Sequence, residues 1–243
     1  MYKYKCVLSY DGHNYMGFQI QEELPTIELE INKALLRLTN QEIKIYPSGR
    51  TDRGVHAKGQ VIHFELDHDI PPIGITKGLN AFLPADIHII STEYASDDFH
   101  ARFSAKSKEY RYYINIGEYD PLTINYAPHI TNLNIDEMRR AIKLFIGKHD
   151  FKGFASASID KRKDTVKEIF NAEINVLDGT LEFVWIGTGF LKYQIRRMMG
   201  LLVEIGRGKE KPEMVSYVLE KKDPKISHRS LDGCGLYLMK VNY

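Results

Sequence analysis

The sequence contains little cysteine and no long hydrophobic run. Only two of its 243 residues are cysteine, Cys6 and Cys234, and neither lies in a CxxC pair or at metal-ligand spacing from a histidine. This scarcity argues against a disulfide framework and against a structural zinc site. No stretch of about 18 consecutive apolar residues occurs, and the opening MYKYKCVLSYDG lacks the apolar core of a signal peptide. We therefore expect a folded protein of the cytoplasm.

Signatures of bound metals and nucleotide cofactors are also missing. The nine histidines include no HxxxH pair, and no carboxylate stands at metal-ligand spacing from them. The glycines at positions 49, 54 and 59 form neither a GxGxxG motif nor a phosphate-binding loop. The sequence therefore predicts neither a metal site nor a cofactor, and His56 and His63 are interpreted as structural residues.

Charge is nearly balanced over the chain but is unevenly distributed along it. The formal net charge is +1. Residues 1–100 hold 9 Lys and Arg against 14 Asp and Glu, whereas residues 101–243 hold 24 against 18. The second half is therefore the better candidate for contact with a polyanion, although such basic clusters are also common on solvated faces. The clusters are Lys106, Lys108 and Arg111; Lys161, Arg162 and Lys163; Lys192, Arg196 and Arg197; and Lys209 and Lys211.

Hydrophobic periodicity predicts an α/β unit in the first half. Residues 3–10 alternate and are rich in β-formers, and residues 26–40 space their apolar side chains as one helical stripe behind a Thr26 N-cap. The strands expected around and after the glycine-rich turn GRTDRG are 43–48, 58–67 and 86–95.

The second half shows a similar pattern. Residues 108–116 are strand-like, 134–147 and 193–208 are expected to be helical, and the chain closes in a strand over 234–243. Two further strands, TVKEIFNAEINVL and LEFVWIG, are joined through Asp178-Gly179, which is a hairpin signal.

The order β, α, β, β, α, β is thus expected twice, in domains over 1–104 and 105–243. This order predicts an α+β protein built from two ferredoxin-like units, with a central mixed, largely antiparallel sheet. Two such sheets set edge to edge would leave a cleft between the halves.

Candidate chemistry concentrates in the strand-turn-strand segment 46–66. Arg50 and Asp52 stand two residues apart in its turn, so in extended backbone they can lie on the same side and form a charge-assisted contact. Such a contact keeps a carboxylate ionised, as a nucleophile or general base requires. An Arg-x-Asp pair is also a common structural ion pair, and the spacing alone does not decide between the two interpretations.

Segments of the chain resemble, in order, the motifs of the TruA family of tRNA pseudouridine synthases. The turn sequence GRTDRGVHAKGQVIHF is similar to the family signature GRTDAGVHAxxQVxHF. The other similar segments are YDGHNYMGFQIQ, NAFLPADIHI, FHARFSAKSKEYRYYI, GKHDFKGFAS and FLKYQIRRMMGLLVEIGRG. Because these segments span nearly the whole chain, the sequence is identified as a member of this family, and the resemblance implies a pseudouridine synthase fold.

The resemblance implies catalytic roles for three residues. Asp52 aligns with the family's essential catalytic aspartate. Tyr110 aligns with an active-site tyrosine whose ring can stack on a flipped-out base and whose hydroxyl can assist loss of the C5 proton. Arg196 aligns with an arginine that pairs with the catalytic aspartate. Without the resemblance, Tyr110 would be interpreted as a core strand residue and Arg196 as a solvated helix residue.

The resemblance also implies substrate-binding residues and exposes departures from the family pattern. Arg50 aligns with the signature arginine that is expected to contact the flipped nucleotide or its phosphate, and Tyr110 is expected to contact the base. Arg53 stands where the family usually has alanine, and it can line the path of the RNA. Phe18 replaces a usual tryptophan, Gln194 a usual methionine, and the tail HRSLDGCGLYL lacks an expected proline.

The function implied is that of an isomerase that converts uridine to pseudouridine in the anticodon stem-loop of tRNA, at positions 38 to 40. The resemblance further implies a homodimer, and the reaction needs no cofactor because it has no redox step and no group donor. Three alternatives remain open from the sequence. The chain can be a paralogue that modifies another tRNA position or ribosomal RNA, a non-catalytic RNA-binding module, or a different hydrolase or lyase that uses Arg50 and Asp52.

Overall fold

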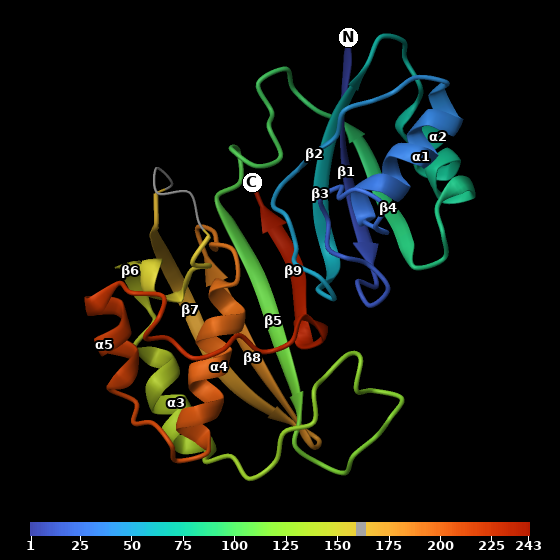
Figure 1. Cartoon of the computed structure of the whole chain (residues 1–243). Coiled ribbons are helices and arrows are strands. Elements are labelled where there is room, and N and C mark those ends of the chain that lie inside the picture. The colour runs from blue at the N-terminus through green and yellow to red at the C-terminus, as the bar shows by residue number, and fades with distance from the viewer. Residues whose placement is uncertain (159–163) are drawn as a thin grey trace. The chain divides into compact units, whose positions relative to one another are not determined.

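The computed structural model describes residues 1–158 and 164–243 (Figure 1). The chain divides into two compact units: unit 1 comprises Met1–Lys106 and Tyr237–Tyr243, and unit 2 comprises Ser107–Leu236. The sequence-based boundary after residue 104 assigned the terminal strand to the second half, whereas the contacts group that strand with unit 1. The basic cluster Lys161, Arg162 and Lys163 lies outside the described residues.

Unit 1 contains a largely antiparallel sheet with the strand order β4-β1-β3-β9, and β2 pairs with β3. Strand β1 is antiparallel to both β3 and β4. The short pairing of β3 with β9 is parallel and joins His56 to Tyr237. The strands are β1 (Tyr2–Tyr10), β2 (Tyr46–Pro47), β3 (His56–Leu66), β4 (Ile87–Tyr94) and β9 (Leu236–Asn242).

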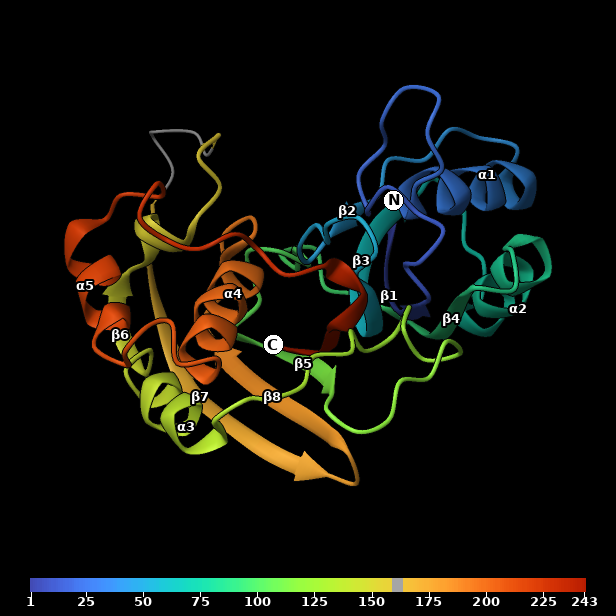
Figure 2. The same ribbon diagram turned by 60° about the horizontal axis from the view of Figure 1, so that its bottom comes forward.

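Two helices cover one face of the unit 1 sheet, α1 (Ile27–Thr39) and α2 (Pro72–Phe82) (Figure 2). Helix α1 begins where the Thr26 side chain accepts a hydrogen bond from the Leu29 backbone N–H, and it ends at Asn40 in the left-handed conformation. The alternating side chains of β1 that face the helices are buried: Tyr4, Cys6, Leu8 and Tyr10.

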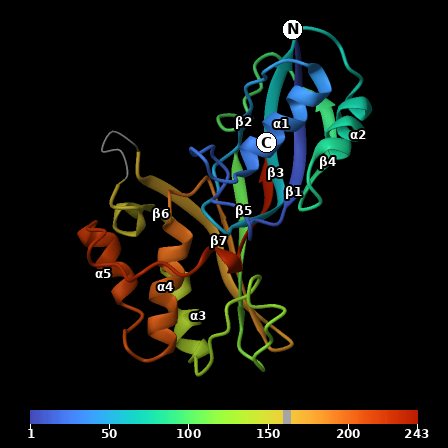
Figure 3. The ribbon, with the colours of Figure 1, turned by 45° about the vertical axis from the view of Figure 1, so that its right-hand side comes forward.

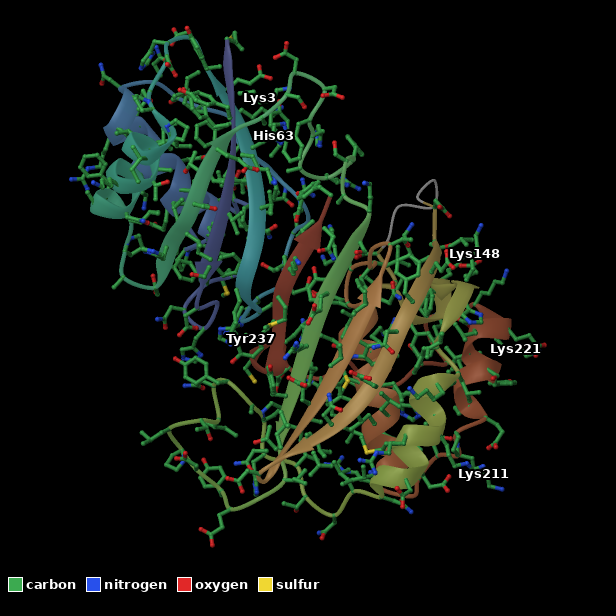
Figure 4. The ribbon with its side chains drawn as sticks, turned by 180° about the vertical axis from the view of Figure 1, so that it is seen from behind. Lys3, His63, Lys148, Lys211, Lys221 and Tyr237 are labelled. Carbon is green, nitrogen blue, oxygen red and sulfur yellow. The ribbon has the colours of Figure 1, made fainter. Side chains whose placement is uncertain are left out.

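The opposite face of this sheet is covered in part by the segment that follows β4. The Lys3 ammonium contacts the backbone carbonyl of Asp97 and forms an ion pair with Glu65. The Tyr243 hydroxyl donates to the Ala101 carbonyl at 2.7 Å. Lys3 and His63 lie close together at one end of the sheet (Figure 4).

Unit 2 contains a fully antiparallel path of four strands in the order β5-β8-β7-β6. Strands β7 and β8 form a tight hairpin through Asp178 and Gly179, which both have positive φ, at 34° and 74°. The strands are β5 (Ser107–Asn115), β6 (Gly147–Asp150), β7 (Val166–Leu177) and β8 (Thr180–Gly187).

Three helices lie on one face of the unit 2 sheet (Figure 3). They are α3 (Ile135–Lys143), α4 (Gln194–Gly206) and α5 (Met214–Lys221), and the 3-10 turns are η1 (Phe151–Phe154) and η2 (Gly233–Gly235). Helix α4 is buried along most of its length, and Trp185 and Phe183 of β8 are fully buried in the same unit. Among the described residues, no helix combines the length and apolarity needed to cross a membrane.

The structure confirms the predicted α+β class and its largely antiparallel sheets. The order β, α, β, β, α, β appears in unit 1 as predicted, with α2 as the helix that the periodicity did not locate. The helix expected over 134–147 ends at Lys143, and the chain then enters β6 at Gly147, whose φ is +110°. The second half also contains β6 and α5, which were not predicted.

Candidate active site

The turn that carries Asp52 lies in unit 1 between β2 and β3. The Asp52 carbonyl accepts a hydrogen bond from the Val55 backbone N–H at 3.2 Å, which closes the turn. Gly54 has a φ of +73°, a conformation that glycine adopts without strain. Thr51 is buried, Asp52 is half-buried, and Arg50 and Arg53 are exposed. The turn therefore presents its cations to solvent and holds the carboxylate at the boundary of the core.

The loop after β1 packs directly against this turn. The Phe18 N–H donates to the Thr51 carbonyl at 3.0 Å. A Cβ on Gly17 would lie 2.9 Å from the Thr51 carbonyl oxygen, and a Cβ on Gly12 would lie 2.1 Å from that of Val55. Only glycine allows the two backbones to approach so closely. The glycines of the YDGHNYMGFQ motif thus serve to bring this loop onto the Asp52 turn.

A buried network of polar side chains from β1 and β3 holds the turn through hydrogen bonds. The Tyr10 hydroxyl bonds to the Thr51 hydroxyl at 2.8 Å. The Gln60 amide donates to the Gly49 carbonyl at 2.8 Å and accepts from the Ser48 hydroxyl at 2.7 Å. Burial raises the pKa of Tyr10 to about 12, so its hydroxyl stays protonated at neutral pH. Strands β1 and β3 thereby anchor the part of the turn that precedes Asp52.

The sequence did not identify this network. Its members come from three separate segments, and their proximity follows from the β1–β3 pairing, which places Leu8 opposite Gln60. One feature of the sequence could have indicated it. Gln60 is a polar residue on the buried, helix-facing side of β3, and a buried polar side chain needs hydrogen-bond partners.

His56 joins the loop after β1 to the start of β3. Its Nδ1 lies 3.0 Å from the Asp11 carboxylate and 3.1 Å from the Gly12 backbone nitrogen. Its ring stacks on Tyr237 with the centroids 4.6 Å apart. The side chain is 2% exposed, and its contacts hold the loop after β1 against β3 and β9.

Tyr110 lies in unit 2, on β5 opposite Trp185 of β8. Its side chain is 8% exposed and makes an edge contact with Phe190, with the ring centroids 5.3 Å apart. Tyr112 and Ile114 follow it on the same face of the strand and are fully buried. Tyr110 therefore occupies the less buried end of a row of buried side chains on β5.

Arg196 lies in the first turn of α4, also in unit 2. Its Nε donates to the Leu231 carbonyl at 2.7 Å, and its own carbonyl accepts from the Leu231 N–H at 3.0 Å. The guanidinium lies 5.1 Å from the centre of the Tyr193 ring. The segment that departs from the family pattern, 228–238, therefore contacts Arg196 directly.

Two other departures from the family pattern are accommodated inside the core. Phe18 is fully buried and packs near Tyr10, with the ring centroids 6.3 Å apart. Gln194 is also fully buried, and its side-chain oxygen accepts from the Leu191 N–H at 2.8 Å. That bond fixes the chain as it enters α4, next to Tyr193 in the left-handed conformation, with a φ of 64°.

The predicted site residues thus fall into two sets. Arg50, Asp52 and Arg53 share one turn of unit 1, whereas Tyr110 and Arg196 lie on β5 and α4 of unit 2. In the described part of the chain, no group of three or more His, Cys, Asp or Glu side chains is arranged to hold a metal ion.

Comparison with known proteins identifies the family. The family model for tRNA pseudouridine synthase matches residues 7–104 and 141–243. Curated relatives named tRNA pseudouridine synthase A include one from Exiguobacterium sp., 41% identical over 100% of this chain and 98% of its own length, and one from Geobacillus sp., 43% identical over 98% and 97%. A solved structure of a Cbf5-Nop10-Gar1 complex matches 96% of this chain and 57% of its own chain, with 14% identity and a TM-score of 0.38. From the family model and the full-length relatives, the chain belongs to the tRNA pseudouridine synthase family.

Proposed function

We propose that this protein is an RNA-modifying isomerase that converts uridine to pseudouridine in tRNA, at positions 38 to 40 of the anticodon stem-loop. The observation that carries the proposal is the similarity of about 40% identity to tRNA pseudouridine synthases A over the whole chain. The reaction breaks the N1–C1′ bond of uridine and forms a C5–C1′ bond. The C5 proton leaves and N1 gains a proton, so no external group donor and no cofactor enters.

We assign the essential carboxylate to Asp52. Support comes from the way its turn is held, because two glycine contacts and a buried polar network limit its motion. Preorganisation of this kind is what a reaction requires when a base must detach, rotate and rejoin the same sugar. A carboxylate at the edge of the core also keeps its access to the substrate.

We assign supporting roles to the other predicted residues. Tyr110 is proposed as the catalytic tyrosine, whose ring contacts the flipped base and whose hydroxyl assists removal of the C5 proton. Arg196 is proposed as the catalytic arginine, and its guanidinium is oriented by the Leu231 carbonyl. The exposed side chains of Arg50 and Arg53 are proposed to contact the nucleotide or its phosphates. We further propose that the enzyme acts in the cytoplasm as a homodimer.

Tritium release tests the activity directly. The purified protein should release tritium from a tRNA transcript made with 5-tritiated uridine, since the C5 hydrogen is lost on pseudouridine formation. Carbodiimide treatment and primer extension on the product should then map the modified positions to 38 to 40. Modification elsewhere would overturn the anticodon assignment but not the isomerase, whereas RNA binding without tritium release would indicate a binding module.

A further inference from the structure

An aromatic stack lies on the face of the unit 1 sheet that the helices leave uncovered. Its members are Tyr46, His63, His100 and Phe103, and they come from β2, β3 and the segment after β4. The centroid distances are 4.9 Å for Tyr46 and His63, 4.7 Å for His63 and His100, and 4.3 Å for His100 and Phe103. The stack runs from a buried ring at His63, which is 4% exposed, to Phe103, which is 75% exposed.

The exposed end of the stack is held rigidly. The His100 Nδ1 accepts from the Arg102 backbone N–H at 3.1 Å, and the Ser104 N–H donates to the His100 carbonyl at 2.9 Å. The His63 Nδ1 accepts from the Ala101 N–H at 3.1 Å and ties the turn to β3. The backbone on either side of Phe103 is therefore held by its own turn, and the ring itself is exposed.

Two cations lie against this stack. The Lys44 ammonium is 5.0 Å from the centre of the Tyr46 ring, and the Arg102 guanidinium is 5.5 Å from that of Phe103. Two exposed carboxylates, Asp97 and Asp98, precede the stack on the same segment. The local charge is thus close to balanced, so an anionic ligand would be held here mainly by contact with the rings.

We infer that the aromatic stack binds an unpaired nucleotide of the RNA substrate, whose base stacks on Phe103 while Lys44 and Arg102 contact the adjoining phosphates. Exposed aromatic rings beside basic side chains are the usual platform for bases outside a duplex. The inference rests on the proposed function for the identity of the RNA. It adds a contact in unit 1 on the face of the sheet opposite the Tyr10 and Gln60 network.

A protein partner fits this surface less well. A stable protein interface buries about 1,200–2,000 Å² in total, whereas a single phenylalanine contributes on the order of 200 Å². The other three rings are packed against one another, and the most exposed of the large hydrophobic ones, Tyr46, is 36% exposed. The outermost ring, Phe103, with Arg102 beside it, matches the size of one base.

Binding of an unmodified tRNA transcript tests the inference. Phe103→Ala should weaken binding about tenfold, the range expected for loss of one stacked base, and should leave the salt dependence of the affinity unchanged because no phosphate contact is lost. Phe103→Trp keeps a stacking ring and should restore the affinity. Phe170→Ala is the matched control, because Phe170 is a 50% exposed phenylalanine on β7 of unit 2.

The outcomes separate this inference from the proposed function. If the unmutated protein binds and modifies the transcript and Phe103→Ala binds equally well, the stack is not an RNA contact. If Phe103→Ala changes the oligomeric mass measured by light scattering, the ring belongs to a protein interface and the inference fails. If the unmutated protein neither binds nor modifies tRNA, the proposed function itself is wrong.

Discussion

The two units hold their predicted site residues in different ways. In unit 1, Asp52 lies on an irregular turn that depends on close backbone contacts and on buried hydrogen bonds from outside the turn. In unit 2, Tyr110 lies within a regular strand and Arg196 in the first turn of a helix, so repeating backbone hydrogen bonds fix their positions. The position of the carboxylate is therefore more sensitive to substitution elsewhere in the chain, because it depends on side chains that are distant in the sequence.

The units also differ less in charge than the sequence halves suggested. Unit 1 holds 12 Lys and Arg against 14 Asp and Glu, and unit 2 holds 21 against 18. Moving 101–106 and the terminal strand into unit 1 reduces the contrast between the halves. Arg102 moves with them, which places a cation of the aromatic stack in the more acidic unit.

The largest effect should come from the carboxylate itself. Asp52→Asn should reduce pseudouridine formation by at least about 1,000-fold, since the amide keeps the shape but can neither attack nor accept a proton. Tritium release under single-turnover conditions measures this, and tRNA affinity should stay within a few-fold. Clear turnover by this variant would remove Asp52 from the mechanism.

Substitution of one buried glutamine in each unit compares how strongly each unit depends on buried hydrogen bonds. Gln60→Met in unit 1 leaves the Gly49 carbonyl and the Ser48 hydroxyl without Gln60, and should lower the free energy of unfolding by about 2–3 kcal/mol. We expect turnover at saturating tRNA to fall about 10- to 100-fold, because the Asp52 turn loses its anchor. Gln194→Met in unit 2 removes one bond to Leu191 and restores the residue usual in the family, so it should cost about 1 kcal/mol or less.

Chemical denaturation measures the free energy of unfolding of both glutamine variants, and single-turnover rates measure their activity. Equal losses of activity would show that unit 2 depends on buried polar anchors as much as unit 1 does.

Tyr110→Phe tests whether the hydroxyl of Tyr110, on strand β5 of unit 2, takes part in the reaction. The strand position and the contact with Phe190 should survive, so tRNA affinity should be retained while the rate falls about 10- to 100-fold through loss of the hydroxyl. Rates with 5-tritiated substrate measure the proton step. A rate equal to that of the unmutated enzyme would leave Tyr110 with a stacking role alone.

Low pH should reduce the free energy of unfolding of unit 1, because His63 takes up a proton when the unit unfolds. Burial, together with His100 and Lys3, lowers the pKa of His63 to about 4, below the value of about 6.5 in an unfolded chain. The unfolded state therefore binds a proton that the folded state does not, and stability is lost as the pH falls from about 6.5 to about 4, by about 3 kcal/mol at most.

His63→Gln keeps an acceptor for the Ala101 N–H and removes the titration. Urea unfolding at several pH values should show a shallower loss of stability for this variant over that interval. Parallel pH profiles for the variant and the unmutated protein would show that His63 is not the source.

Arg53→Ala should give the smallest effect. It restores the small residue usual in the family at an exposed position next to Asp52, so stability should change by less than about 0.5 kcal/mol. We expect a few-fold change in rate or in the choice among neighbouring uridines, which primer extension on one transcript measures. Identical rate and site choice would show that Arg53 has no role in positioning the substrate.

Regular elements were the predictable part of the fold. Helix α1 and strand β3 follow from clear periodicity, and the β7–β8 hairpin from Asp178-Gly179. Helix α2 was not located because Gly74 and Gly78 interrupt its pattern. Helix α5 has only eight residues and no side-chain N-cap, so its local signal is weak.

The sequence motifs supply the candidate site residues, but they do not predict the contacts that hold those residues in place. The signature motif located Asp52 and Arg50 directly. The Tyr10, Ser48 and Gln60 contacts depend on strand register, which is set by packing over the whole sheet rather than by local sequence. The aromatic stack was missed for the same reason, since Tyr46 and His63 meet only after β2 pairs with β3.

The return of the terminal strand to unit 1 has a consequence for biosynthesis. Because β9 pairs with β3 and Tyr237 stacks on His56, the nascent chain cannot complete the sheet beside the Asp52 turn until residues 236–242 have left the ribosome. All the strands and helices within unit 2 are synthesised before that point. We therefore expect a chain truncated after residue 235 to leave the β3 edge next to the Asp52 turn unpaired, and limited proteolysis should cut at this turn faster than in the full chain.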